Sequence, residues 1–179
     1  LREPAIQSLE RTLLATYRPG HGVAHDFDGE VGVRGLLTDH VHASAALIAA
    51  YHATDNVAYS MLAEELMHVA IRTMWDDERG GFFDRAASAD DRGRLREPLK
   101  PFALNCDAAR VLGRLASIGD PEFRPRAVDA LASQTGAYRL HGLAAASYGL
   151  ALEELTAPAA TDVPALRADL CEDEDAPVE

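Results

Sequence analysis

Residues 37–51 read LTDHVHASAALIAAY, and the apolar side chains of this stretch lie nearly all round a helix. A second apolar stretch, LNCDAARVLGRL, occupies residues 104–115. Each follows a long loop rich in glycine and acidic residues, and each leads through a short turn into an amphipathic helix. Tyr59 and Phe123 are equivalent, so the unit repeats after 64 residues. A repeated unit of this kind buries its apolar face only against its neighbours, so the repeat predicts the fold.

Hydrophobic periodicity predicts six helices. The first, third and fifth are amphipathic, and they alternate with a second, fourth and sixth that are apolar on most faces. Helices of the second kind have to be covered on both sides. The expected ranges of the first four helices are 4–17, 39–53, 57–74 and 105–117. The fifth runs from the cap at Asp120-Pro121 to Gly136, and the sixth covers 141–155.

This alternation is typical of an inner ring of helices sheathed by an outer ring. We therefore expect an all-α fold, a partial α/α toroid of about three helical hairpins, over residues 1–157. An ordinary helical bundle is the alternative. Residues 158–179 are acidic and contain proline, which predicts a partly disordered tail.

Two connections between an amphipathic helix and the next apolar helix are long, at residues 18–38 and 75–104. Long loops without regular structure are uncommon in compact domains and tend to be functional. In a toroid both loops lie at the end where the inner helices begin. The sequence therefore predicts a shared mouth at that end.

The net charge is −12, from 29 acidic against 17 basic residues, and Lys100 is the single lysine. An acidic surface repels phosphate backbones, which argues against a nucleic-acid partner. No apolar run reaches the roughly 18 residues of a membrane span, and no signal segment is recognisable. We expect a soluble, cytoplasmic protein. Because the chain begins at Leu1, we also expect it to be a piece of a longer protein.

The two cysteines, Cys106 and Cys171, have no metal-ligand spacing and suit a reducing compartment. We expect Cys106 to be a small core residue. A nucleophile near the start of a helix is the alternative.

Three stretches carry a resemblance to a known family: GLLTD at residues 35–39, ATDN at 53–56 and WDDERGGFFD at 75–84. They resemble one region of the YyaL-type proteins, also called the spermatogenesis-associated thioredoxin-domain family. Asn105 and GDPEF at residues 119–123 continue the similarity, which covers roughly residues 5–155.

The resemblance implies an N-terminal thioredoxin-like domain followed by a six-hairpin α/α toroid similar to N-acylglucosamine 2-epimerases. This chain would supply about the last three hairpins of that toroid, without the thioredoxin-like part. Two features depart from the family. His40 stands where an aromatic residue is usual, and residues 102–105 read FALN in place of Pro-Ser-Gly-Asn.

Asp39, Asn105 and His141 each fall at the expected start of an apolar helix, so they are predicted to line one pocket at the mouth. The alternative for Asp39 and Asn105 is that they only cap their helices, since Asp and Asn are favoured N-caps. Sugar epimerisation needs a group that titrates near neutrality, which histidine supplies. His40 and His141, with Asp39, are the candidate catalytic residues.

A sugar also needs a flat apolar surface against its C–H groups. Trp75, Phe82 and Phe83 flank the glycine pair of the longest loop, and with Asn105 and Asp84 they are the candidate substrate-binding residues. Packing of the same aromatic side chains onto the helices is the alternative. A carboxylate pair for glycoside hydrolysis has no specificity in so acidic a chain.

Metal binding is not predicted. His40 and His42 are two residues apart, and on a helix such residues point to nearly opposite sides. The glycine-rich loop contains a further possible ligand cluster, for which we prefer a solvated hairpin: His21, His25, Asp26 and Asp28. No cofactor is expected.

Two functions follow as hypotheses. The first is a carbohydrate-handling domain of epimerase or isomerase type. The second is a non-catalytic helical scaffold that serves the thioredoxin-like domain or another partner. The long loops at one mouth favour the first, and the departures from the family favour the second. Half a toroid leaves a seam, so we expect a homodimer, or packing against the missing part of the parent protein, through the first and last hairpins.

Overall fold

The computed structural model describes residues 2–30 and 32–157, and within these ranges the chain is all-α, as predicted. Short 3-10 turns lie at Gly93–Arg96, Tyr138–Leu140 and Gly142–Ala145. The expected acidic tail at residues 158–179 lies outside the described residues. The α-helices of the described part are α1 (Arg2–Thr16), α2 (Leu37–Thr54), α3 (Val57–Met74), α4 (Phe102–Ile118), α5 (Phe123–Ala132) and α6 (Ala146–Thr156).

The last helix begins later than predicted. Residues 138–145 form the two 3-10 turns, and α6 starts only at Ala146, not at His141. Gly142, the first residue of the second turn, has a φ of 51°, a left-handed conformation that interrupts α-helical hydrogen bonding. His141 therefore lies in a turn that precedes the helix.

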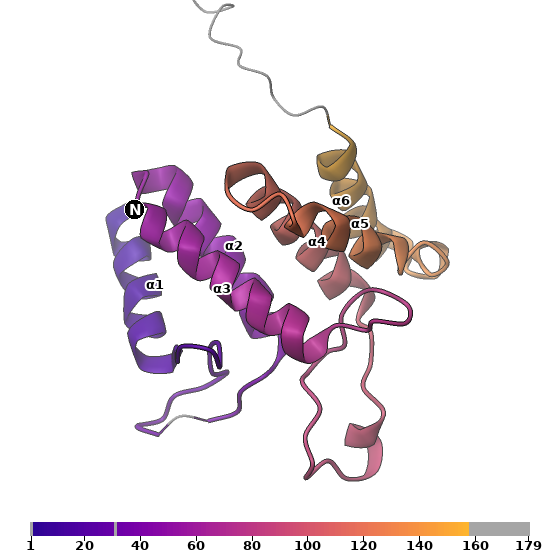
Figure 1. Ribbon diagram of the computed structural model, residues 1–179, viewed down its shortest axis with the longest axis horizontal. Coiled ribbons are helices and arrows are strands. Elements are labelled where there is room, and N and C mark those ends of the chain that lie inside the picture. Colours follow the sequence, from indigo (N-terminus) through magenta and orange to yellow (C-terminus); the bar gives the residue numbers. More distant parts are fainter. Residues whose placement is uncertain (1, 31, 158–179) are drawn as a thin grey trace, which may run out of the picture.

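The helices pack as successive pairs (Figure 1). Helix α2 lies along α3, and α4 lies along α5. Helix α2 also contacts α4, which in turn contacts α6, so the three helices predicted as inner ones touch in succession. Two packed hairpins with flanking helices fit a toroid segment and a bundle equally, and the toroid stays a prediction. Among the described residues, none of the helices combines the length and the apolar character that a bilayer span requires.

Helix α4 forms the centre of the core. Its inner positions are fully or almost fully buried, and each buried leucine or valine contributes about 1.5–3 kcal/mol relative to exposure. Cys106 is among them, which confirms its place in the core, and burial raises the pKa of its thiol to about 11. The other buried apolar residues of α4 are Phe102, Ala108, Ala109, Val111, Leu112 and Leu115.

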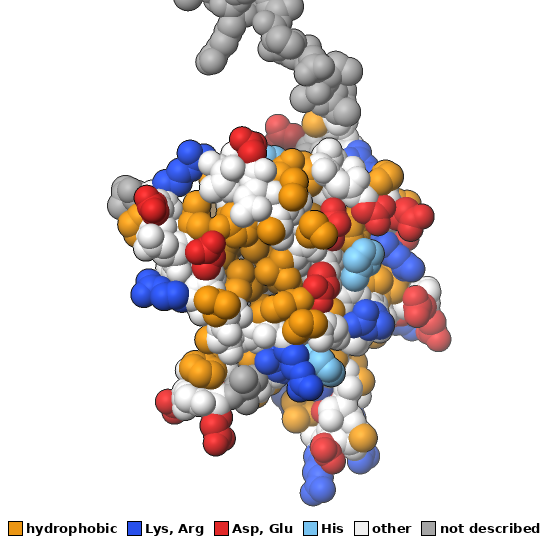
Figure 2. All heavy atoms as spheres, turned by 60° about the vertical axis from the view of Figure 1, so that its left-hand side comes forward, with side chains coloured by type: hydrophobic (Ala, Val, Ile, Leu, Met, Phe, Trp, Pro, Cys, Tyr) orange, Lys and Arg blue, Asp and Glu red, His pale blue; other side chains and the backbone are white. Residues whose placement is uncertain are grey.

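Helix α1 packs loosely by comparison. Of its apolar side chains only Leu13 is buried, and Leu14 is 87% exposed. Helix α2 presents Ala46 and Ala49 to solvent on the neighbouring side, so it is not covered all round. Figure 2 shows hydrophobic side chains gathered in the middle of this side of the molecule, with charged groups around them.

The loop at residues 75–101 is fastened to the start of α4 by one side chain. Asn105 Oδ1 accepts a hydrogen bond from the Phe82 amide (2.6 Å), and Asn105 Nδ2 donates to the carbonyls of Phe82 and Pro101 (3.0 Å each). Asn105 and Phe82 are both fully buried. The amide of Asn105 thus satisfies main-chain groups of Phe82 that would otherwise be buried without a partner.

The glycine pair of this loop has a steric reason. Gly81 has a φ of 78°, and a Cβ at this position would collide with Ser133 Oγ at the end of α5. Only glycine lets the turn approach α5 this closely. The Trp75 ring meets the Phe82 ring edge-on, with centroids 4.8 Å apart. The GGFFD element therefore packs the loop against the helices.

Replacing Asn105 by alanine should be costly, because it leaves a buried N–H and a buried C=O of Phe82 without partners. We expect N105A to lower the free energy of unfolding by about 3 kcal/mol. The matched control is N56A, since Asn56 Oδ1 only caps α3 at an exposed site and its loss should cost about 1 kcal/mol. Urea unfolding monitored by circular dichroism measures both. Equal losses of unfolding free energy in N105A and N56A would contradict the role of Asn105 in fastening the loop.

Candidate functional site

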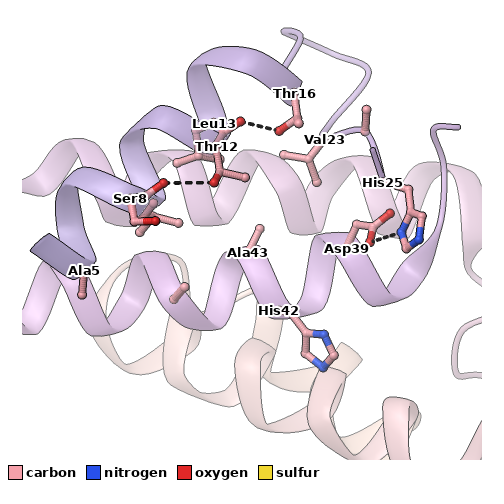
Figure 3. Close-up of a pocket in the computed structure, with 13 residues that line it drawn as sticks. Ala5, Ser8, Thr12, Leu13, Thr16, Val23, His25, Asp39, His42 and Ala43 are labelled. Atoms are coloured by element: carbon pink, nitrogen blue, oxygen red, sulfur yellow. Dashed lines mark hydrogen bonds and ion pairs between the residues drawn. The ribbon is translucent and has the colours of Figure 1, made fainter. Parts of the chain in front are cut away.

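A cavity of about 560 Å³ lies between α1 and α2 (Figure 3). Alanine, leucine and valine side chains make up most of its wall, and hydroxyl groups of α1 lie along one side. A histidine and an aspartate close one end. Its lining residues are Ala5, Ser8, Leu9, Thr12, Leu13, Thr16, Val23, Ala24, His25, Asp39, His42, Ala43 and Ala46.

The histidine and the aspartate at this end form a pair. His25 Nδ1 lies 3.0 Å from Asp39 Oδ1 (Figure 3). Asp39 belongs to the first turn of α2, and His25 belongs to the preceding loop. Main-chain bonds fix the loop, because the His25 amide donates to the Val33 carbonyl (2.8 Å) and Ala24 pairs with Arg34 in an isolated bridge. The pair is therefore held by a structured hairpin.

The two partners differ in exposure. The His25 side chain is 54% exposed, whereas that of Asp39 is 15% exposed. The hydrogen bond that His25 donates to Asp39, and then the negative charge of Asp39, raise the pKa of His25. Asp39 Oδ2 is buried and has no hydrogen-bond partner among the described residues. An imidazole oriented by a carboxylate at the rim of a cavity can exchange a proton near neutral pH.

His40, one of the predicted catalytic residues, is not part of this cavity. It is fully buried, and its Nδ1 donates to the Leu36 carbonyl (2.8 Å). The other nitrogen, Nε2, faces Gly22, where a Cβ would collide with it. Burial lowers the pKa of His40. A neutral, buried imidazole of this kind packs the loop against α2 and gives no support to a role in proton transfer.

His141 lies away from this cavity, in the turn before α6, and packs against the start of α4. Its exposed ring stacks on Phe102, with the centroids 4.0 Å apart and the planes 11° apart. The Tyr148 and Tyr138 rings continue this stack. Asp39, Asn105 and His141 thus have different neighbours: a loop histidine, the main chain of Phe82, and an aromatic stack. The structure does not place the three around one described cavity.

The expected N-caps also have a different role. Helix α2 is capped at Leu36 and α4 at Pro101, so Asp39 and Asn105 lie inside the first turns. The N–H of Leu37, at the start of α2, donates to the carbonyl of Asp84, which is remote in sequence. The alternative interpretation, that Asp39 and Asn105 only cap their helices, is therefore wrong.

The remaining candidate substrate-binding residues hold the loop at residues 75–101. The Arg126 guanidinium lies 4.8 Å from the centroid of the Trp75 ring, and the Lys100 ammonium lies 5.3 Å from that of Phe83. Asp84 Oδ1 accepts from the amide of Leu99 (3.0 Å). These are contacts within the chain, and they agree with the alternative to sugar binding, in which the aromatic side chains pack onto the fold.

Sequence reasoning treated His25 only as a possible metal ligand and missed its pairing with Asp39. The two residues are 14 positions apart, and only the hairpin that begins after α1 brings them together. The spacing by itself carries no signal for this contact. Across the residues that the structure describes, no three His, Cys, Asp or Glu side chains are grouped so that they could hold a metal ion.

No family model matches the chain, and no curated protein does. The resemblance to the YyaL-type proteins therefore stays an expectation.

Removal of the Asp39 charge should lower the pKa of His25. We expect D39N to bring it from its raised value towards about 6.5, because both the charge-assisted hydrogen bond and the attraction are lost. Titration of the His25 Hε1 resonance by NMR measures the shift, and H25N assigns the signal.

The same pair predicts a pH dependence of stability. The pKa of His25 is raised on folding, so its contribution is complete below the unfolded value of about 6.5 and is lost as the pH rises through the folded pKa. An unchanged His25 titration in D39N would contradict the pairing.

Proposed function

We propose that this chain is a non-catalytic helical interaction domain, which packs against a second helical surface through the face at the start of α6. The observation that carries the proposal is a group of exposed leucines. Leu140 is 85% exposed and Leu143 is 97% exposed, both just before α6, and Leu150 within the helix is about half exposed. Large apolar side chains that are exposed next to one another on a surface mark interaction sites.

The contacts of the predicted catalytic and substrate-binding residues support the same conclusion. His40 and Asn105 are buried and engaged in contacts that hold loops to helix starts. Phe82 is fully buried as well. These residues would have formed the mouth of an epimerase-like toroid, and their side chains are not available to a ligand. The scaffold hypothesis therefore explains their contacts better than the enzyme hypothesis does.

The partner that we propose is a second copy of the chain, arranged about a two-fold axis. Such an axis brings the same leucine group of each copy together, so that one patch covers the other. As part of a YyaL-type protein, the same face would instead pack against helices of the parent protein. In either case the leucines leave water, which stabilises the contact by about 25 cal/mol for each Å² buried.

The oligomeric state tests this directly. We expect the chain to be a dimer in multi-angle light scattering at tens of micromolar, and L140E/L143E to be a monomer, since two buried carboxylates cannot be tolerated at the contact. The matched control is L14E on the exposed side of α1, which should leave the dimer intact. Circular dichroism checks that each variant is folded, and a monomeric wild-type chain would overturn the proposal.

A second candidate function has an observation of its own. The cavity between α1 and α2 carries the oriented His25–Asp39 pair at one end and hydroxyl groups of Ser8 and Thr12 along its wall. A small carbohydrate fits this combination of hydroxyl partners and a proton-transferring imidazole. This candidate retains the epimerase-like hypothesis but moves its site from His40 and His141 to His25.

A thermal-shift screen with monosaccharides and disaccharides tests this candidate. A sugar present at ten times its Kd stabilises the fold by about 1.4 kcal/mol, which raises Tm by about 3 °C for a chain of this size. We expect H25N to abolish the shift and H52Q, an exposed histidine at the end of α2, to retain it. No stabilisation by any sugar in the millimolar range would rule the candidate out.

A further inference from the structure

A second cavity, of about 900 Å³, lies where α4 and α6 end and α5 begins. Among the described residues that line it are three arginines and a single acidic residue, Glu154. We call this the cationic groove and define it by Arg110, Arg114, Arg124 and Glu154. Three arginines in one groove are notable in a chain with a net charge of −12 and 17 basic residues in all.

Two of the arginines share one carboxylate. Arg110 Nη2 lies 2.7 Å and Arg114 Nη2 lies 2.8 Å from Glu154 Oε1, and Arg114 Nε also donates to Glu154 Oε2 (3.0 Å). Burial of Glu154 opposes its ionisation, but the hydrogen bonds from Arg114 and Arg110 outweigh this and lower its pKa. One negative charge thus faces two positive charges. Asp107 adds a surface contact to Arg110 at 3.7 Å, a geometry that is worth little.

The third arginine has a neutral partner. Arg124 Nη2 donates to the main-chain carbonyl of Leu155, in the last turn of α6. Within the described ranges, no carboxylate lies within 4.0 Å of its guanidinium. The partial negative charge of a helix C-terminus compensates such a cation only in part. The cationic groove therefore keeps an excess of positive charge.

The chain itself supplies a segment of opposite charge. Ala157 lines the groove, and the sequence continues from it into residues 158–179, which contain seven acidic residues and a single arginine. Four of the acidic residues are consecutive, from Glu172 to Asp175. A chain of 15 residues spans up to about 50 Å, so this run can return to the groove from which the segment leaves.

We propose that the cationic groove binds a carboxylate-rich peptide, and that its occupant is the chain's own C-terminal segment, residues 158–179. Carboxylates fit guanidinium groups through paired, charge-assisted hydrogen bonds. Because the segment is tethered, its effective concentration at the groove is in the millimolar range, and weak individual contacts suffice. The groove lies at the end of α6 remote from Leu140 and Leu143, so this inference is independent of the proposed dimer face.

The native cysteines allow a direct test in the full chain. Cys106 is buried, so a nitroxide reagent can be directed to Cys171, four residues or fewer from the acidic run. We expect the label to broaden the amide NMR signals of Ser117 and Ile118 in the groove and to leave those of Ala5 and Ser8 on α1 sharp. C171S gives the unlabelled reference, and salt at about 1 M should remove the broadening by screening.

The charge-neutralised variant E172Q/D173N/E174Q/D175N should lose the broadening while keeping the label and the length of the segment. R124Q should weaken it several-fold, whereas R79Q, which removes a charge from the loop at residues 75–101, should have no effect. If R124Q is unfolded by circular dichroism, the tail variant alone decides. Broadening that is absent, or equal in the wild type and the tail variant, would overturn the proposal. Binding of an added peptide of residues 165–179 equally to both would show an acidic partner in place of the tail.

Discussion

Helix α4 has to be covered on most of its surface, and the other elements of the fold are arranged by that requirement. Its buried side chains take up one face of α5 and contact α2 and α6 as well. At Gly113 the approach is so close that a Cβ would lie 2.6 Å from Leu155 Cδ2. Its first turn carries Asn105, which fixes the long loop, and its outer face carries the arginines that bind Glu154. One helix therefore connects the core, the loop and the cationic groove.

The parts of the fold that could be predicted from the sequence are those determined by local patterns. The range predicted for the third helix, 57–74, agrees with α3, because Asn56 is an N-cap and the apolar face has a regular period. Its neighbours were less accurate where a distant group decides the boundary. Helix α2 begins before Asp39 because a carbonyl of the remote residue Asp84 accepts from Leu37. No local pattern contains that contact.

The candidate site shows the same division. Sequence reasoning identified Asp39 and Asn105 as polar residues at the starts of apolar helices. In the structure the two residues have the same role. Asp39 binds His25 of the loop before α2, and Asn105 binds Phe82 of the loop before α4. Each fastens the preceding loop to the helix that follows it. Their expected convergence on one pocket required a closed ring, and the spacing of the repeat contains no information on whether the ring closes.

The two ends of helix α6 differ in their surroundings. Before its first turn, Leu140 and Leu143 are exposed and favour a contact that excludes water. At its last turn, Glu154 and the Leu155 carbonyl tie it to α4 and α5 through arginines. These ties hold α6 in place by hydrogen bonds, since only Ala151 and Leu155 of the helix are buried. A helix with so small a buried face depends on the arginines for its position, and so the leucine face that it presents depends on them too.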